Sequence, residues 1–279
     1  MTRLLRYRHD ALTFDVRDEG PLGGDPVVLL HGFPERNTCW RDVVPPLHAH
    51  GLRTYAPDQR GYSPGARPPR RRDYTMHKLE ADVVALIEAI GGPVHLVGHD
   101  WGANSGWLVA MHRPELVRTW TAVSVPHPAA FRRAMFSSSQ AFSSWYMGAF
   151  QAPRLPERSA AERGGRFEKG LRNGGMTTED VDRFRREIVD YGALPGALNW
   201  YRAMPFTHQR DLQDKVAVPT TLLWGDGDIA VKRVSVDRCA DRVTGPYELR
   251  VLPGVSHWIP AHAPEAVADA VLSRIGSVA

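Results

Sequence analysis

The amino-acid sequence predicts an α/β protein with a mostly parallel central sheet flanked by helices and one helical insertion. Three observations predict this fold class. Short β-branched and apolar runs that end in glycine or proline recur along the 279 residues, and helical patterns fit between the early runs. From about residue 127 to residue 212 the strand pattern stops, and it resumes at Val218.

The predicted strands are apolar runs of four to seven residues. They are Val27–Leu30, Leu52–Ala56, Val94–Val97, Thr119–Val125, Thr220–Trp224 and Tyr247–Leu252. Between the second and third of them, Met76–Ile90 repeats apolar residues at the spacing of one helix face. This alternation of strand and helix is typical of a parallel sheet.

The insertion divides the predicted core into two parts. Residues 1–126 form the first part of the core, residues 127–212 form a helical lid (cap), and residues 213–279 complete the core. The middle segment contains paired glycines at 164–165 and 174–175 and no convincing buried strand. We therefore expect a lid on the core and not an independent domain.

Composition and charge exclude several classes of protein. With 43% hydrophobic and 24% charged residues, the chain is neither collagen-like nor disordered. No apolar run reaches the roughly 18 residues that span a bilayer, and charged residues interrupt the N-terminus, so we expect a cytoplasmic protein.

The net charge of +4 comes from arginines that are dispersed along the chain, which argues against a nucleic-acid partner. The two cysteines, Cys39 and Cys239, are expected to be free thiols.

The segment Val94–Ala103 contains the clearest chemical motif. A buried strand leads into Gly98-His99-Asp100-Trp101-Gly102, which is followed by a helical pattern. This is the arrangement of a nucleophile elbow, in which small flanking residues permit a strained turn that presents the central side chain. Here the central residue is Asp100. A carboxylate is ionised at neutral pH and can attack a carbon atom directly, forming an ester with the enzyme.

Three further segments accompany this motif in the same order as in a known family. They are His31-Gly32-Phe33-Pro34-Glu35, Ala56-Pro57-Asp58-Gln59-Arg60-Gly61-Tyr62-Ser63 and Asn199-Trp200-Tyr201-Arg202. On these motifs the chain resembles α/β-hydrolases of the epoxide hydrolase and haloalkane dehalogenase branch, and most closely the epoxide hydrolases. The resemblance runs through nearly the whole chain and implies an α/β-hydrolase fold with a cap.

The resemblance also implies a base and an acid that orients it. It maps the catalytic histidine onto His257, whereas His262 lies outside the pattern. It places the acid at Asp228, with Asp226 as the rival two residues earlier. The resulting chain order of nucleophile, acid and base is that of α/β-hydrolases.

Several site residues are implied in the same way. The backbone N–H groups of Phe33 and Trp101 would form the oxyanion hole, with a cis bond between Phe33 and Pro34. Phe33, Trp101, Phe150 and Met204 match substrate-lining positions.

Opening an epoxide also needs a proton donor, because the departing alkoxide is strongly basic. A phenol with a pKa of about 10 is suited to this task. The family pattern uses two lid tyrosines, which correspond here to Tyr146, in a Y-x-x-x-F-Q-x-P segment, and Tyr201.

The sequence therefore predicts an epoxide hydrolase that acts on a small-molecule epoxide without a metal or an organic cofactor. A haloalkane or haloacid dehalogenase with the same nucleophile is the first alternative. Phe33 has no donor side chain for a halide, so a lid residue such as Trp145 would have to assist Trp101 in that case. A non-catalytic small-molecule receptor of the same fold is the second alternative. Both a monomer and a homodimer stay open.

Overall fold

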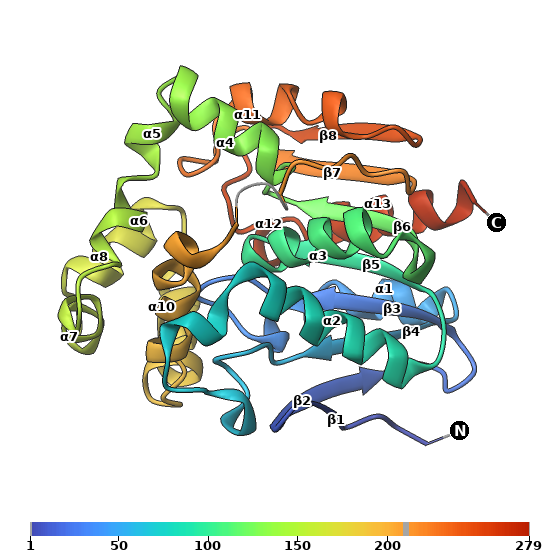
Figure 1. Cartoon of the computed structure of the whole chain (residues 1–279), viewed down its shortest axis with the longest axis horizontal. Coiled ribbons are helices and arrows are strands. Elements are labelled where there is room, and N and C mark those ends of the chain that lie inside the picture. The colour runs from blue at the N-terminus through green and yellow to red at the C-terminus, as the bar shows by residue number, and fades with distance from the viewer. Residues whose placement is uncertain (1, 209–211, 279) are drawn as a thin grey trace.

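A computed structural model of the chain describes residues 2–208 and 212–278 and contains one eight-stranded sheet (Figure 1). The strand order is β1-β2-β4-β3-β5-β6-β7-β8. The first two pairings are antiparallel, and every later neighbour pairs in parallel. The strands are β1 Arg6–His9, β2 Leu12–Glu19, β3 Asp25–Leu30, β4 Leu52–Pro57, β5 Val94–His99, β6 Val117–Val123, β7 Thr220–Gly225 and β8 Tyr247–Leu252.

Successive side chains of a strand point to opposite faces of the sheet, so buried strands give the sheet two apolar faces. Helices cover both of them. In β5, Leu96 joins one buried apolar cluster and Val97 joins the other. The cluster around Leu96 includes side chains of α2 (Met76–Ile90) and α3 (Trp101–His112). The cluster around Val97 includes side chains of α1 (Val44–Ala49) and α13 (Pro264–Gly276).

The described residues between β6 and β7 form a series of helices joined by loops. Figure 1 shows α5 to α8 standing beyond one end of the strands, with α10 between them and the core. The elements are α4 Pro128–Ser137, α5 Gln140–Ser143, α6 Trp145–Ala149, α7 Leu155–Ala161, α8 Arg166–Asn173, α9 Thr178–Phe184, the π-helix η5 Arg185–Val189, α10 Leu194–Arg202 and the 3₁₀ turn η6 Met204–Phe206. The described residues of this segment contain no strand, as the sequence predicts.

The remaining elements are short helices in the loops around the sheet. They are η1 Asn37–Trp40, η2 Pro64–Ala66, η3 Arg71–Tyr74, η4 Pro114–Leu116, α11 Arg233–Asp237, η8 Ala240–Arg242 and α12 Ile259–His262.

The structure departs from the predicted strands in two places. The antiparallel strands β1 and β2 precede the first predicted strand, and they extend the sheet by two members. Strand β6 spans Val117–Val123 and not residues 119–125, because Ser124 has a φ of 68° that ends the extended backbone. The helix predicted over Met76–Ile90 is confirmed at both ends.

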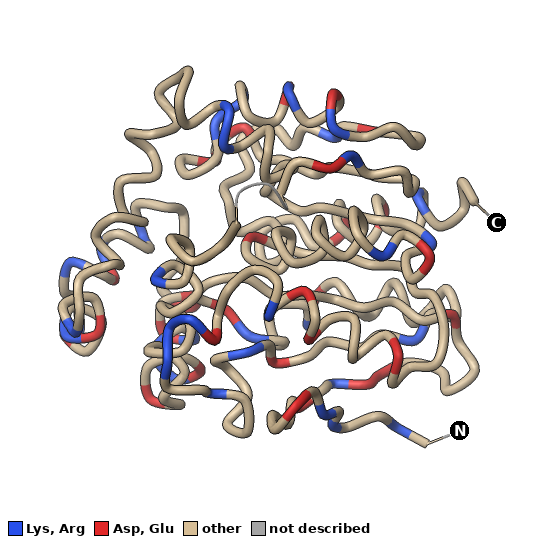
Figure 2. Tube along the Cα trace, in the orientation of Figure 1, with Lys and Arg blue, Asp and Glu red and all other residues tan. Residues whose placement is uncertain are grey.

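Charged residues are spread over the molecule, with one short basic run. Figure 2 shows Lys and Arg (blue) and Asp and Glu (red) interspersed along the trace, apart from the basic run Arg70–Arg72 before α2. Cys39 and Cys239 are both buried and free, as predicted. Within residues 2–208 and 212–278, no helix is both long enough and apolar enough to cross a membrane.

Candidate active site

Asp100 occupies a strained turn between β5 and α3. Its φ of 52° and ψ of −117° are unfavourable for any residue with a side chain, and flanking glycines make room for the turn. A Cβ atom at Gly102 would lie 2.2 Å from the Leu30 carbonyl oxygen. A Cβ atom at Gly98 would lie 2.5 Å from the Gly102 carbonyl oxygen. The two glycines therefore allow β3, β5 and α3 to approach closely, and the turn holds the largely buried Asp100 carboxylate at the strand ends.

His257 lies between two carboxylates. Its Nδ1 is 2.6 Å from Asp228 Oδ2, and its Nε2 is 3.4 Å from Asp100 Oδ2. The other oxygen of Asp228 accepts the backbone N–H groups of Ala230 and Val231, at 2.7 and 2.9 Å. These bonds fix the buried Asp228 carboxylate and, through it, the orientation of the imidazole.

Asp226 and His262, the rival candidates for the acid and the base, make contacts elsewhere. Asp226 Oδ1 accepts the backbone N–H of Gly254 at 2.5 Å in an exposed loop. His262 contacts Asp180 and Ser256, at 3.0 Å each. The geometry therefore brings Asp228 and His257, and neither rival, to Asp100.

Phe33 provides a backbone donor to the nucleophile. Its N–H donates to Asp100 Oδ1 at 2.7 Å, and its peptide bond to Pro34 is cis. The preceding residue must be glycine, because a Cβ atom at Gly32 would lie 2.4 Å from Asp100 Cβ. Trp101, the other predicted donor, is the first residue of α3, where backbone N–H groups lack partners within the helix.

Aromatic side chains from the lid pack around the nucleophile. Tyr201 is only 2% exposed, and its ring centroid lies 5.0 Å from Trp101, 5.1 Å from both Phe33 and Phe150, and 6.0 Å from Tyr146. Tyr146 also contacts Phe150 at 5.7 Å. Residues 33 and 101 come from the core and the other three from the lid, so the ring cluster joins the two parts.

Both tyrosines remain protonated at neutral pH. Burial raises the pKa of Tyr201 well above 10, and the nearby negative charge of Asp100 raises it further. The pKa of Tyr146 is raised by the same two causes in the same order. Each phenol can therefore donate a hydrogen bond or a proton to a group that becomes negatively charged beside Asp100.

The Asp100–His257 pair is ionic in the resting site. Burial lowers the pKa of His257, but the carboxylates of Asp228 and Asp100 outweigh burial and raise it to about 10. Burial raises the pKa of Asp100, but its bond to His257 and the charge of that ring lower it below its usual range. At neutral pH the site therefore holds a carboxylate beside an imidazolium.

A second layer of buried titratable groups lies next to the Asp100–His257 pair, and the sequence did not predict it. Glu35 Oε2 lies 3.5 Å from His99 Nδ1, and His99 Nε2 lies 2.9 Å from the His257 carbonyl oxygen. Burial raises the pKa of Glu35 to about 6, against the opposing charge of Arg183. Burial lowers the pKa of His99 to about 4, so this ring is neutral.

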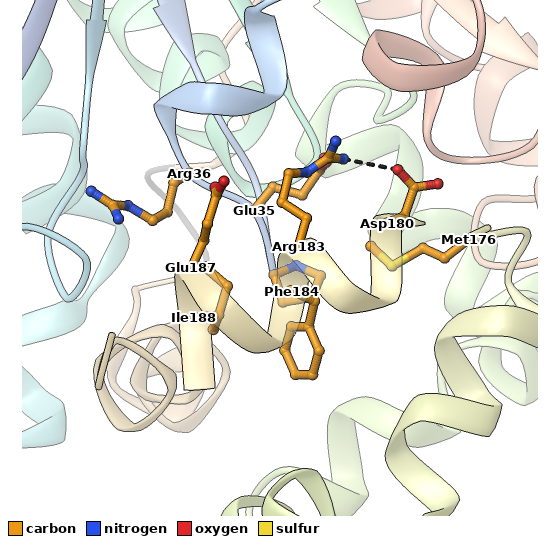
Figure 3. A pocket seen from close by; sticks show the side chains of 9 residues that line it. Glu35, Arg36, Met176, Asp180, Arg183, Phe184, Glu187 and Ile188 are labelled. Carbon is orange, nitrogen blue, oxygen red and sulfur yellow. Dashed lines mark hydrogen bonds and ion pairs between the residues drawn. The ribbon is translucent and has the colours of Figure 1, made fainter. Parts of the chain in front are cut away.

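Arg183 connects this layer to the lid. Its guanidinium lies 3.3 Å from Glu35 and 3.0 Å from Asp180, and Figure 3 shows the contact with Asp180 as a dashed line. The side chains surround a cavity of about 10 Å³, room for roughly one water molecule. The spacing of Asp180 and Arg183 is an ordinary helical i,i+3 pair. Nothing in the sequence could have indicated that Glu35, 148 residues away, would join it.

Two predicted lid residues are exposed to solvent. Met204 is 37% exposed in η6, so its role as a lining residue stays a prediction. Trp145, the example of a lid donor for a halide, is 72% exposed. The structure thus gathers Asp100, Asp228 and His257 with Tyr146, Tyr201 and the predicted lining residues Phe33, Trp101 and Phe150.

A mostly parallel sheet with a nucleophile elbow, an Asp–His pair and a helical segment after β6 defines an α/β hydrolase. The family described as alpha/beta hydrolase fold matches residues 25–264. The chain therefore belongs to the α/β-hydrolase family, and the relatives below place it in the epoxide hydrolase branch.

Similar proteins include curated relatives and solved structures. Epoxide hydrolase 3 of Xenopus tropicalis is 33% identical over 94% of this chain and 74% of its own length. Epoxide hydrolase A of Mycobacterium tuberculosis is 31% identical over 92% of each chain. The crystal structure of epoxide hydrolase VrEH1 from Vigna radiata is 28% identical, covers 97% of this chain and 98% of its own, and has a TM-score of 0.80.

Proposed function

We propose that this protein is an epoxide hydrolase that converts an epoxide into a vicinal diol through a covalent ester on Asp100. The observation that carries the proposal is the packing of two protonated lid phenols on the residues that flank the nucleophile. Tyr201 packs against Phe33 and Trp101, with ring centroids 5.1 and 5.0 Å apart, and Tyr146 packs against Tyr201 at 6.0 Å. Phe33 is the residue whose N–H donates to Asp100. The names of the relatives support the choice of substrate class.

In the first step, Asp100 Oδ2 attacks an epoxide carbon and the carbon–oxygen bond of the ring breaks. The phenols of Tyr146 and Tyr201 hold the ring oxygen, and one of them gives it a proton. This leaves a hydroxyalkyl ester on Asp100 and one phenolate. Oδ1 becomes the ester carbonyl oxygen, because it already accepts the Phe33 N–H at 2.7 Å.

Ester formation changes the state of His257. Asp100 loses its negative charge, so one of the two carboxylates that raise the pKa of His257 disappears. The imidazolium can then return a proton to the phenolate through water, leaving a neutral base. The enzyme thus prepares its base only after the nucleophile has reacted.

In the second step, His257 takes a proton from a water molecule that attacks the Asp100 carbonyl carbon. The resulting oxyanion is stabilised by the Phe33 N–H, with the Trp101 N–H as the second proposed donor. The tetrahedral intermediate collapses, its hydroxyl proton passes to the departing alkoxide, and the diol leaves. Asp100 is again a carboxylate and His257 is again protonated, so the cycle closes.

Two measurements test this proposal. The first is diol formation across a panel of terminal, aryl and trans-disubstituted epoxides. The second is mass spectrometry of the His257→Gln variant after exposure to styrene oxide, with wild type as the control. We expect the Asp100 peptide of the variant to gain the mass of one intact epoxide.

Two results would contradict the proposal in different ways. An unmodified variant that still binds the epoxide would exclude the covalent ester. Halide release from chloroalkanes, without diol formation from any epoxide, would favour a dehalogenase. The exposure of Trp145 weighs against that outcome, because a halide site needs a second donor beside Trp101.

A further inference from the structure

Two histidines and a glutamate meet where the start of α2 lies beside the end of α3. His77 Nδ1 lies 3.2 Å from Glu80 Oε2, and His112 Nδ1 lies 2.8 Å from Glu80 Oε1. The two imidazole rings are stacked, with centroids 6.2 Å apart. None of these residues has a part in the proposed hydrolysis. Imidazole nitrogen and carboxylate oxygen are the ligands that Zn²⁺ takes in many proteins.

Helix geometry explains why the three side chains converge. His77 and Glu80 are three residues apart on α2 and therefore lie on the same helix face. His112 is the last residue of α3, the helix that packs against α2. One nitrogen of each imidazole and one oxygen of Glu80 all lie within 4.8 Å of one another.

These spacings are close to those of a zinc site. With bonds of 2.0–2.1 Å, two ligand atoms of a tetrahedral zinc site are about 3.3 Å apart. The two imidazole–carboxylate separations of 3.2 and 2.8 Å need to change by only a few tenths of an ångström. The remaining adjustment falls on the His77 side chain, which is 42% exposed and can change rotamer at little cost.

Burial and charge also suit a cation. Glu80 is only 8% exposed, so its negative charge is partly removed from water. The neighbouring cation, Arg113, has its guanidinium 2.6 Å from Glu115, which limits its repulsion of a second cation. The exposed edge at His77 gives an ion access from solvent.

We propose that His77, Glu80 and His112 form a site for a divalent transition-metal cation of the Zn²⁺ type. The ion takes a lone pair from each neutral imidazole, whose single proton then resides on its other ring nitrogen. One or both oxygens of Glu80 complete the set of three protein ligands, and other ligands such as water fill the rest of the coordination sphere.

The site would stabilise the fold and take no part in the reaction. Twelve residues of α3, at about 1.5 Å each, separate Asp100 from the end of the helix by about 18 Å. A metal ion there would clamp the end of α3 to α2. Because α3 begins directly after the nucleophile, the clamp would restrain the helix on which the elbow is built.

The test uses the full chain, without a histidine tag and stripped of metal by chelation. Calorimetric titration with Zn²⁺ should show one ion per chain with micromolar or tighter affinity. Co²⁺ should give the visible absorption bands of a four- or five-coordinate ion. Thermal unfolding should shift to higher temperature with one equivalent of Zn²⁺, because an ion that binds only the folded state stabilises it.

Matched variants decide whether these residues hold the ion. His77→Gln and His112→Gln should each weaken Zn²⁺ binding at least tenfold and abolish the cobalt bands. The control is His50→Gln, since His50 is also an exposed histidine at a helix end, but its ring contacts only the Pro46 carbonyl among the contacts described. Far-UV circular dichroism checks that each variant is folded, and the exposed position of His77 makes misfolding of that variant unexpected.

Three results would overturn the proposal. They are no stoichiometric Zn²⁺ binding by wild type, unchanged binding in His77→Gln, and equal loss of binding in His50→Gln. In each case the cluster would be a hydrogen-bonded network that satisfies the buried Glu80 carboxylate.

Discussion

The two carboxylate oxygens of Asp100 have different partners, because the Phe33 N–H binds one of them and leaves the other facing His257. The Phe33 N–H donates to Oδ1 at 2.7 Å, whereas Oδ2 faces His257 Nε2 at 3.4 Å. A hydrogen bond to Oδ1 favours negative charge on that atom both in the resting carboxylate and in a tetrahedral intermediate. In the proposed mechanism, Oδ2 is therefore the atom that attacks, and Oδ1 is the atom held during hydrolysis of the ester.

The first prediction concerns the origin of the new oxygen atom in the diol. If water attacks the Asp100 carbonyl carbon, as we propose, the oxygen that leaves with the product comes from Asp100. In a single turnover in H₂¹⁸O, we expect ¹⁸O in the Asp100 peptide and ordinary oxygen in the diol, both measured by mass spectrometry. Label in the diol after one turnover would show that water attacks the epoxide directly.

The second prediction tests how closely β3 approaches the elbow. In Gly32→Ala the new Cβ atom would lie 2.4 Å from Asp100 Cβ and 2.6 Å from Oδ1, so the Phe33 N–H must move away. We expect kcat to fall about 10²–10³-fold, the usual loss for one oxyanion donor. The free energy of unfolding should fall by about 1–3 kcal/mol from overpacking.

Gly92→Ala is the matched control for this substitution, because no heavy atom lies within 4 Å of its added Cβ. Its activity and stability should stay close to those of wild type. Wild-type kcat in Gly32→Ala would mean that the contact between Gly32 and Asp100 does not constrain the site.

The third prediction follows from the raised pKa of His257. In the unfolded chain a histidine loses its proton near pH 6.5, and in the folded site near pH 10. The folded state therefore binds the extra proton between these values, and the stability it contributes is present below about pH 6.5 and lost as pH rises towards 10. The contribution is of the order of a few kcal/mol.

Chemical denaturation between pH 7 and pH 9.5 measures this contribution. The free energy of unfolding of wild type should fall over this range by more than that of His257→Gln, which lacks the titrating group. The same slope in both proteins would contradict an imidazolium in the resting site.

Much of the site could be predicted from the sequence because its residues follow strands. Asp100, Asp228 and His257 each come after a strand that the apolar pattern identifies, and parallel strands bring their carboxyl ends to one edge of the sheet. The choice of Asp228 over Asp226 as the acid that orients the histidine rested on the resemblance to the family. The structure supplies its physical reason, since the N–H groups of Ala230 and Val231 hold only Asp228 towards His257.

Long-range side-chain contacts could not be predicted in the same way. The pairing of Glu35 with Arg183 joins a core turn to a lid helix, and it depends on how the lid packs. Strand β1 has only four residues and one buried side chain, which is too short a pattern to stand out from a loop. Met204 matched the family position, but its side chain is 37% exposed in η6.

The last prediction separates the two lid tyrosines by their surroundings. Tyr201 is almost fully buried, and its ring packs against Trp101 with centroids 5.0 Å apart. Tyr201→Phe keeps this ring packing and removes the buried hydroxyl, so we expect slower alkylation together with a loss of stability of about 1 kcal/mol. Tyr146 is only half-buried, so Tyr146→Phe should slow alkylation with a smaller loss of stability. Single-turnover formation of the ester and thermal unfolding measure the two effects separately.

Because either phenol can hold the ring oxygen, each single variant should keep part of the rate of ester formation, and the double variant should lose about 10²–10⁴-fold. Full activity in the double variant would mean that neither tyrosine donates to the epoxide.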